Sequence, residues 1–228
     1  MRFFIPNFLT LSNLIIGFIC IISIINQSND FPILILFYAC LFLDFLDGFL
    51  ARKLKTTSEF GKQLDSLADL VSFALLPALI LYYHLENISD NILLKYISIF
   101  IVLFSAIRLA KFNISKKGNA FFEGLPTPAN ALFFMSLLYY DGNLNKYLTS
   151  EVFLILTILF SMLLVSRFEF ISFKFSKFNF KNNLDRYIII LFATISFILF
   201  GHSILFITVL FYVLYSISKS IFSKLFFK

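Results

Sequence analysis

Long apolar runs separated by short polar segments make up most of the chain. A helix that crosses a bilayer needs about 20 predominantly apolar residues, and most of these runs approach that length. Polar and turn-forming residues bound each run. The pattern predicts an all-α, polytopic membrane helix bundle with about eight transmembrane helices. The predicted spans are 8–25, 31–52, 63–83, 92–113, 128–140, 152–171, 187–200 and 203–222.

Composition supports a membrane protein. Hydrophobic residues make up 60% of the chain, against roughly 45–50% in soluble domains, and charged residues make up 14%, against roughly 25%. A soluble domain of 228 residues cannot hide so much apolar surface. A soluble globular enzyme, a disordered chain and a nucleic-acid-binding module are therefore excluded. Cys20 and Cys40 lie within apolar runs, and we expect buried free thiols there.

Basic residues are distributed unevenly between the two sets of loops that alternate along the chain. One set carries Arg52, Lys53, Lys55, Lys62, Lys111, Lys116, Lys117, Arg167, Lys174, Lys177, Lys181 and Arg186. The other set carries only Lys95 and Lys146, beside several acids. The positive-inside rule places the basic set in the cytoplasm, together with both termini if the number of spans is even. The net charge of +6 then reflects topology and anionic headgroups, and no nucleic-acid partner is expected.

Four aspartates break the apolar pattern. Asp44 and Asp47 lie in the second predicted span, and Asp65 and Asp69 lie in the third. A charged side chain at the bilayer centre costs about 2.5–3.5 kcal/mol on insertion scales, so such residues are rare and usually functional. With about 100° of rotation per residue, each pair shares one face of its helix. Because the two helices are antiparallel neighbours, we expect the four carboxylates to meet near the cytoplasmic surface.

The four carboxylates would repel one another unless cations neutralised them. Oxygen ligands of this kind suit Mg²⁺, Mn²⁺ or Ca²⁺ rather than Zn²⁺. Gly48 and Ala51 leave room for a bulky ligand, and the Arg52 guanidinium suits a phosphate group. The residues therefore predict metal-assisted chemistry on a phosphorylated, lipid-tethered substrate. A polar cluster that only ties helices together and a small ion-binding membrane transporter are the alternatives.

The segment from Asp44 to Asp69 resembles the CDP-alcohol phosphatidyltransferase family, because it matches the signature D-x-x-D-G-x-x-A-R-x(8)-G-x-x-x-D-x-x-x-D without a gap. The resemblance implies an integral membrane enzyme that moves a phosphatidyl group from a CDP-linked lipid to an alcohol and releases CMP. It also implies two divalent cations, Mg²⁺ or Mn²⁺, with Asp44 and Asp65 shared between them. Asp47 would bind the first cation and Asp69 the second, and Asp69 would also be the catalytic base.

The same resemblance implies a site for the CDP-lipid around these acids. Some of its residues match family positions that contact the CDP moiety, and others are the small residues of the signature. Two belong to the opening Pro-Asn-Phe-Leu-Thr stretch, which is similar to the nucleotide-contacting start of family members. The implied residues are Asn7, Thr10, Gly48, Ala51, Arg52, Ser58 and Gly61. We expect a single membrane domain over residues 1–228, with a catalytic core at about 5–140 and additional helices at about 150–228.

Two further features bear on the acceptor alcohol. Arg108 and Lys111 lie three residues apart on one face at the cytoplasmic end of the fourth span, where they could hold an anionic group. Gly124 and Pro126 belong to a stiff Gly-Leu-Pro turn that has little freedom to lose on binding. The two cations could equally reflect topology and snorkelling, and the turn could equally be an ordinary entry into the fifth span.

These segments are similar to those of bacterial and archaeal family members that use serine. The matching stretches are Asp-Leu-Val-Ser-Phe from Asp69, Arg-Leu-Ala-Lys-Phe-Asn from Arg108 and Phe-x-Gly-Leu-Pro from Phe122. The resemblance implies CDP-diacylglycerol and L-serine as substrates, contact with membrane lipids, and a homodimer. It also implies a bacterial-type inner membrane, with the active site facing the cytoplasm. Glycerol 3-phosphate or an inositol phosphate as acceptor is the alternative within the family.

Overall fold

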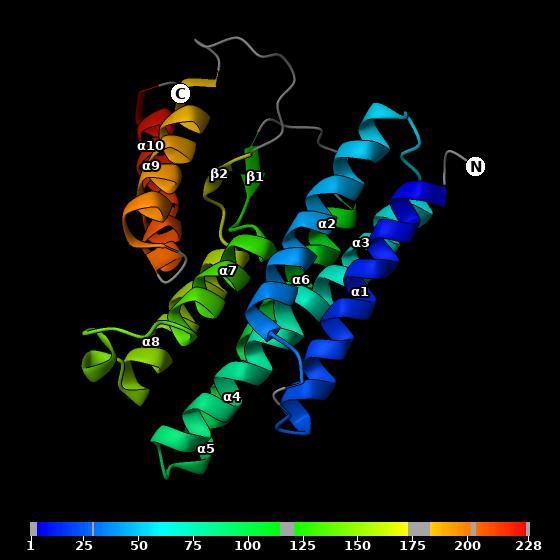
Figure 1. Ribbon diagram of the computed structural model, residues 1–228. Helices are drawn as coiled ribbons and strands as arrows, with labels where there is room; N and C mark the ends of the chain where they lie inside the picture. Colours follow the sequence, from blue (N-terminus) through cyan, green and yellow to red (C-terminus); the bar gives the residue numbers. More distant parts are fainter. Residues whose placement is uncertain (1–3, 29, 115–120, 173–182, 202–203, 227–228) are drawn as a thin grey trace. The chain divides into compact units, whose positions relative to one another are not determined.

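Helices account for most of the chain (Figure 1). The computed structural model describes residues 4–28, 30–114, 121–172, 183–201 and 204–226. The predicted all-α membrane class is confirmed, because five of the described helices are long and apolar enough to cross a bilayer. They are Phe4–Ile25, Ile33–Lys53, Glu59–Ile88, Ile92–Ile114 and Leu205–Ser223. Five of the predicted basic loop residues lie outside the described ranges, namely Lys116, Lys117, Lys174, Lys177 and Lys181.

The chain divides into two compact units, Met1–Ser115 and Lys116–Lys228. In the first unit, α1 (Phe4–Ile25) runs antiparallel to α2 (Ile33–Lys53), and α3 (Glu59–Leu70) also packs against α1. A π-helical turn, η1 (Val71–Leu75), continues α3 directly into α4 (Leu76–Ile88). The remaining elements of the unit are α5 (Ile92–Lys95), the 3₁₀ turn η2 (Tyr96–Ser98) and α6 (Ile99–Ile114).

Helix α1 shows how the first unit suits an apolar surrounding. Its outward face exposes large hydrophobic side chains, among them Phe8, Leu11, Ile15, Phe18 and Ile22. Its inward face buries small and polar residues, among them Thr10, Asn13, Gly17 and Cys20. Lipid tails are as apolar as leucine, so small and polar residues favour helix–helix contact in a membrane more than large apolar ones do. The polar side chains of α1 are thereby directed toward the neighbouring helices.

A close contact between α1, α2 and η1 fixes the core of this unit. A Cβ atom at Gly17 would lie 2.3 Å from the Ser72 Oγ, so only glycine fits there. The Ser72 hydroxyl donates to the backbone carbonyl oxygen of Asn13 at 3.2 Å, and the Cys40 thiol donates to the same oxygen at 3.6 Å. Cys20 and Cys40 are buried free thiols, as predicted.

The second unit combines helices with a two-stranded sheet that the sequence pattern did not predict. Its elements are β1 (Phe121–Glu123), α7 (Thr127–Leu138), the 3₁₀ turn η3 (Asn145–Tyr147), α8 (Ser150–Leu164), β2 (Glu169–Ile171), α9 (Leu184–Phe200) and α10 (Leu205–Phe226). The strands are antiparallel, with Phe121 opposite Ile171 and Glu123 opposite Glu169. The Phe133 ring of α7 stacks on the Phe160 ring of α8, with centroids 3.8 Å apart.

The sixth predicted span, 152–171, is wrong at its C-terminal end. Helix α8 ends at Leu164, and residues Glu169–Ile171 form strand β2. Apolar periodicity does not separate a short buried strand from a continuing helix. The strand forms because β1 and side chains of α10, both distant in sequence, supply its hydrogen-bond partners.

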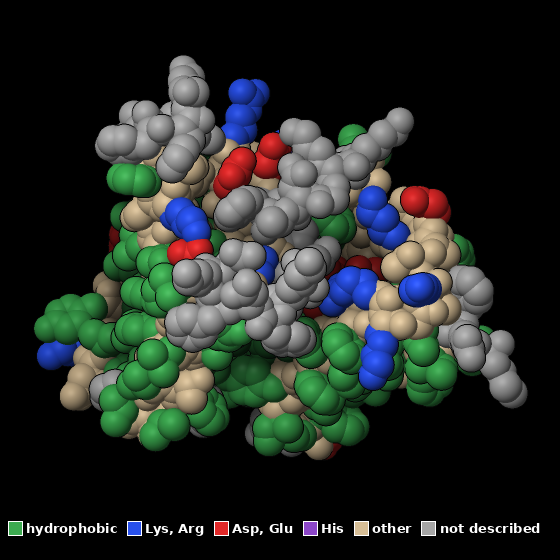
Figure 2. Space-filling model, turned by 90° about the horizontal axis from the view of Figure 1, so that it is seen from above, with side chains coloured by type: hydrophobic (Ala, Val, Ile, Leu, Met, Phe, Trp, Pro, Cys, Tyr) green, Lys and Arg blue, Asp and Glu red, His purple; other side chains and the backbone are tan. Residues whose placement is uncertain are grey.

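In the first unit, charged side chains lie where α2 ends and α3 begins. Figure 2 views this end and shows Lys and Arg side chains with acidic ones nearby, next to hydrophobic side chains. Arg52, Lys53 and Lys55, at and just beyond the end of α2, are exposed. Such a distribution is typical of helix ends that meet lipid headgroups.

Candidate active site

Three of the four predicted carboxylates come together between α2 and α3. Ligand oxygens of Asp44, Asp47 and Asp65 all lie within 4.8 Å of one another. Asp47 is buried, and the other two are partly buried. Residues three or four apart share one face of a helix, so each helix presents its acids to the other. The helix faces deduced from the spacing are thus the faces that meet.

Helix α1 contributes directly to this carboxylate group. The Thr10 hydroxyl oxygen lies 2.6 Å from the Asp47 Oδ2 and 3.0 Å from the Pro6 carbonyl oxygen. A hydroxyl has one proton to donate, so the two acceptors share it. Thr10 was predicted to line the site of the CDP-lipid, here called the donor site, and in the structure its hydroxyl is also a hydrogen-bond partner of Asp47.

Asp69 lies one turn beyond Asp65 on α3 and outside the group of three. Its side chain is 8% exposed. Its Oδ1 is buried and accepts no hydrogen bond from the described residues. The negative charges of Asp44, Asp65 and Asp47 and the positive charge of Arg108 all act on it. A buried carboxylate oxygen left open in this way is suited to a substrate proton or a cation.

Three of the predicted donor-site residues, Asn7, Ser58 and Gly61, lie together at the start of α3, and the space that Gly61 leaves by having no side chain is here called the recess at Gly61. Ser58 caps the helix, and its side chain accepts a hydrogen bond from the Gly61 backbone N–H at 3.0 Å. A Cβ at Gly61 would lie 3.2 Å from the Asn7 Oδ1 and 3.2 Å from the Ser58 Oγ. The absence of a side chain at Gly61 therefore keeps polar atoms of α1 and α3 accessible beside one another.

The remaining predicted donor-site residues lie on the last turns of α2. A Cβ at Gly48 would lie 3.3 Å from the Arg52 Nη1, so the guanidinium folds back along its own helix. Arg52 is exposed, and Ala51 is only partly buried. The guanidinium of Arg52 therefore lies over Gly48, the residue after Asp47, where it could bind a phosphate group.

The two predicted acceptor cations occupy different surroundings on α6. Arg108 is half-buried and acts electrostatically on Asp69, whereas Lys111 is exposed. The prediction that both hold one anionic group is untested. Of the two cations, Arg108 is the one whose charge acts on Asp69.

Asn113 is a positioning residue that the sequence reading did not single out, although it ends the Arg-Leu-Ala-Lys-Phe-Asn stretch. Its Nδ2 donates to the Gln63 Oε1 at 2.9 Å, and its Oδ1 accepts from the Ser66 hydroxyl at 3.1 Å. The Lys62 ammonium donates to its backbone carbonyl at 2.7 Å. These contacts tie the end of α6 to α3 between Gly61 and Asp69.

Asn13 is a second residue that the sequence reading did not single out. It lies three residues beyond Thr10 on the buried face of α1, and its side chain is completely buried. Neither its Oδ1 nor its Nδ2 has a hydrogen-bond partner among the described residues. Its spacing from Thr10 is the signal that could have identified it.

The predicted acceptor turn lies in the second unit. Gly124 has a φ of 81°, and a Cβ there would lie 2.2 Å from the Leu164 carbonyl oxygen. Its N–H donates to the Phe168 carbonyl at 3.0 Å, and the Leu125 N–H donates to the Leu163 carbonyl at 2.9 Å. Pro126 precedes the first residue of α7. The turn is held by these two backbone hydrogen bonds, and its stiffness and its acceptor role stay predictions.

Comparison with known proteins places this site in a family. A model described as CDP-alcohol phosphatidyltransferase matches residues 3–174. A CDP-diacylglycerol–serine O-phosphatidyltransferase of Helicobacter pylori is 37% identical over 184 residues, which cover 77% of this chain and 75% of the relative. One of Bacillus subtilis is 34% identical over 175 residues, covering 75% and 92%.

An archaeal relative extends the comparison. An archaetidylserine synthase of Methanothermobacter thermautotrophicus is 33% identical over 171 residues, which cover 72% of this chain and 68% of the relative. The family match includes all the carboxylates, the recess at Gly61 and the Gly-Leu-Pro turn. This chain therefore belongs to the CDP-alcohol phosphatidyltransferase family.

Proposed function

We propose that this membrane enzyme transfers the phosphatidyl group of CDP-diacylglycerol to the hydroxyl of L-serine and releases CMP. Family membership supports the phosphatidyl transfer. The names of the relatives, which specify serine or archaetidylserine, support serine as the acceptor. The observation that carries the chemistry is the convergence of Asp44, Asp47 and Asp65 oxygens within 4.8 Å between α2 and α3.

The carboxylate group fits a pair of Mg²⁺ or Mn²⁺ ions, because its donors are oxygen atoms only. Clustered carboxylates in an apolar surrounding are costly unless cations neutralise them. Asp44, Asp47 and Asp65 would hold the ions together with Asp69, whose buried Oδ1 has no hydrogen bond from the described residues. Bound there, such ions stabilise negative charge on the phosphates and on departing CMP.

The donor lipid is proposed to bind where α1, α2 and α3 meet. Asn7 and Ser58 border the recess at Gly61 and offer polar atoms to the nucleotide. The Arg52 guanidinium beside Gly48 offers charge-assisted hydrogen bonds to a phosphate. Thr10 holds Asp47 in place by its hydrogen bond. The apolar outer faces of the helices are suited to the acyl chains.

Asp69 is the proposed general base for the serine hydroxyl. Its Oδ1 accepts the proton as the serine Oγ attacks phosphorus. A new P–O bond forms while the bond between phosphorus and the CMP oxygen breaks. Arg108 acts electrostatically on Asp69, which supports the proposal that it attracts the serine carboxylate. Lys111 is proposed to support Arg108 in this role, and the turn of Gly124 and Pro126 in the second unit stays a proposed acceptor feature by itself.

The topology that goes with this function has eight spans, both termini in the cytoplasm and the active site in the cytoplasmic leaflet of a bacterial-type inner membrane. The uneven distribution of basic loop residues supports this orientation. We further propose one membrane domain over residues 1–228, with its catalytic core at 5–140, and a homodimer as the assembly.

The test is CMP release by purified protein in mixed micelles of detergent and CDP-diacylglycerol with Mn²⁺. Serine, glycerol 3-phosphate and inositol phosphate are compared as acceptors, and chelator treatment followed by Mn²⁺ tests the cation requirement. We expect release with serine, its loss on chelation and its return with Mn²⁺. Release only with a phosphorylated acceptor would overturn the serine assignment, and no release with any acceptor would favour a transporter.

A further inference from the structure

Helix α10 lies beyond the segment that the family model matches, which ends at residue 174. It nevertheless carries three buried polar side chains spaced by four residues, Tyr212, Ser216 and Ser220, which we name the α10 stripe. Residues at this spacing lie on one face of a helix. Polar side chains on the buried face of an otherwise apolar helix are costly unless they have partners.

The partners of the α10 stripe are backbone groups of strand β2. The Tyr212 hydroxyl donates to the Ile171 carbonyl oxygen at 3.0 Å. The Ile171 N–H donates to the Ser216 hydroxyl oxygen at 3.5 Å, and the Glu169 N–H donates to the Ser220 hydroxyl oxygen at 3.0 Å. The stripe therefore follows β2 along its length.

Strand geometry explains why the α10 stripe has this spacing. Backbone groups of alternate residues point to the same side of a strand, so those of Glu169 and Ile171 share one side. The groups of Phe170 then point to the other side, toward its opposite residue Phe122 in β1. The stripe occupies the edge on which a third strand would otherwise pair.

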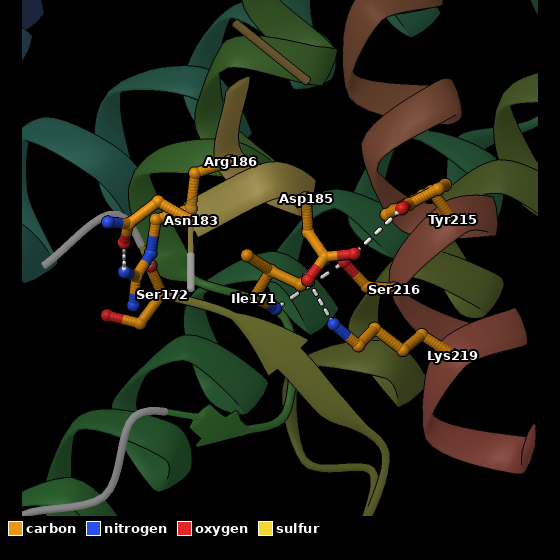
Figure 3. A network of polar contacts seen from close by, with 8 residues as sticks. All are labelled: Ile171, Ser172, Asn183, Asp185, Arg186, Tyr215, Ser216 and Lys219. Atoms are coloured by element: carbon orange, nitrogen blue, oxygen red, sulfur yellow. Dashed lines mark hydrogen bonds and ion pairs between the residues drawn. The ribbon is translucent and has the colours of Figure 1, made fainter. Parts of the chain in front are cut away.

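Polar contacts of α9 strengthen the same junction (Figure 3). The Asp185 carboxylate accepts a hydrogen bond from the Tyr215 hydroxyl at 2.8 Å and pairs with the Lys219 ammonium. The Arg186 Nε donates to the Ser172 carbonyl, immediately after β2, at 2.6 Å. The start of α9, the end of β2 and the C-terminal half of α10 are thus joined by side chains.

Strand β2 is connected in turn to the Gly-Leu-Pro turn. Strand β1 ends at Glu123, the residue before Gly124. The Gly124 N–H donates to the carbonyl of Phe168, the residue before β2. A Cβ at Gly124 would lie 2.2 Å from the Leu164 carbonyl oxygen, so the turn also packs closely against the end of α8.

We propose that the α10 stripe positions the acceptor turn. Tyr212, Ser216 and Ser220 hold β2, β2 holds β1 and the residues that bind Gly124, and the turn is thereby kept in the shape that receives serine. The stripe residues are positioning residues, since none of them belongs to the proposed site. The inference rests on the proposed function for the identity of the acceptor, but the order of the turn can be measured without it.

The first test compares the double variant Ser216→Ala/Ser220→Ala with Ser218→Ala in the full-length protein. Ser218 is the matched control, because it is exposed on the same helix and, within the part of the chain that the structure describes, donates only to the Leu214 carbonyl. The double variant is expected to raise KM for serine about tenfold, with kcat and KM for CDP-diacylglycerol changed by no more than about twofold. Ser218→Ala is expected to match the wild type. The single variant Ser216→Thr keeps a hydroxyl, and its KM for serine is expected to stay close to that of the wild type.

A second measurement keeps the inference testable if serine is not the acceptor. Hydrogen exchange at the Gly124 and Leu125 amides, measured in detergent, is expected to speed up in the double variant and not in Ser218→Ala. Unchanged exchange at both amides would overturn the inference. A loss of kcat without a change in KM for serine would also overturn it, because that result indicates general destabilisation. A wild-type protein inactive with serine would instead overturn the proposed function alone.

Discussion

The carboxylate site of the first unit and the α10 stripe of the second both bury polar groups among apolar helices, but they satisfy those groups differently. Each of the three side chains in the α10 stripe has a backbone partner in β2. In the first unit, the Asp69 Oδ1 and both polar side-chain atoms of Asn13 have no hydrogen-bond partner among the described residues.

That difference separates a structural polar group from a group prepared for a ligand. A fully paired buried network stabilises one arrangement of the chain. A buried polar atom without a partner costs free energy, and such a cost is retained mainly where a substrate, ion or water completes the site. The contrast predicts that mutations in the first region reduce catalysis, whereas mutations in the second change position or stability.

The largest expected effect is at Asp69. Asp69→Asn keeps the shape of the side chain but removes its basicity, and we expect CMP release to fall by about a thousandfold. The variant should elute from size-exclusion chromatography like the wild type, because no hydrogen bond to Oδ1 is lost. Full activity in this variant would contradict the proposal that Asp69 is the general base, and its role would then be structural, like that of the α10 stripe.

Thr10→Val sharpens the comparison, because Thr10 lies in the carboxylate site but has a hydrogen-bond partner there. It removes the hydrogen bond to Asp47 at nearly constant volume. Hydrogen bonds to charged groups are worth about 1.5–3 kcal/mol, so we expect kcat/KM to fall by about ten- to a hundredfold. Ser12→Ala is the matched control on α1, since the hydroxyl of Ser12 donates to the Phe8 carbonyl of its own helix and to no other group among the described residues. Equal activities for the two variants would show that Thr10 does not support the carboxylate group.

Gly61→Ala tests the recess at the start of α3. The new methyl group would lie 3.2 Å from both the Asn7 Oδ1 and the Ser58 Oγ. It is therefore expected to raise KM for CDP-diacylglycerol by about tenfold while leaving KM for serine within about twofold. The measurement is initial-rate kinetics with each substrate varied in turn. If KM for serine rises instead, the recess belongs to the acceptor and not to the donor.

The smallest expected effect concerns the ion pair of the second unit. Burial alone raises the pKa of Asp185, but hydrogen bonds from Lys219 and Tyr215 and the Lys219 charge outweigh it and leave the pKa below its ordinary value of 3.8. The resulting stability is present above the ordinary pKa and is lost as pH falls through the lower folded-state pKa. The pair is partly exposed, so its contribution is about 1 kcal/mol or less.

Thermal unfolding in detergent measures this contribution. Wild type is expected to have a slightly higher Tm than Asp185→Asn at neutral pH, and the difference should shrink as the solution is acidified below pH 3.8. A difference that grew on acidification would show that burial, and not Lys219, controls Asp185. CMP release at neutral pH should be nearly equal in the two proteins, in contrast to the Asp69 variant.

The sequence predicted those parts of the site that depend on local spacing. Asp44 and Asp47 are three residues apart, and Asp65 and Asp69 are four apart, so the helical period alone assigns each pair to one face. The short connection between α2 and α3 then makes the two faces neighbours. The convergence of Asp44, Asp47 and Asp65 could be deduced without coordinates for that reason.

Contacts between residues distant in sequence could not be deduced in the same way. Nothing local distinguishes Ser216 and Ser220, which bond β2, from Ser218, which faces outward on the same helix. Strand β2 was predicted as the end of a span because its apolar residues fit either structure until β1 and α10 are placed beside it. Asn113 was passed over because its partners, Gln63 and Ser66, are on another helix.

The sequence by itself determined that this protein is a helical membrane protein with a carboxylate site at the ends of α2 and α3. Apolar length and helical spacing are properties of single segments, and the bilayer and the α-helix convert them directly into structure. Only the tertiary structure decided which buried polar groups are paired and which are left open. Pairing depends on the distance between atoms of different segments, and that distance is set only when the helices pack.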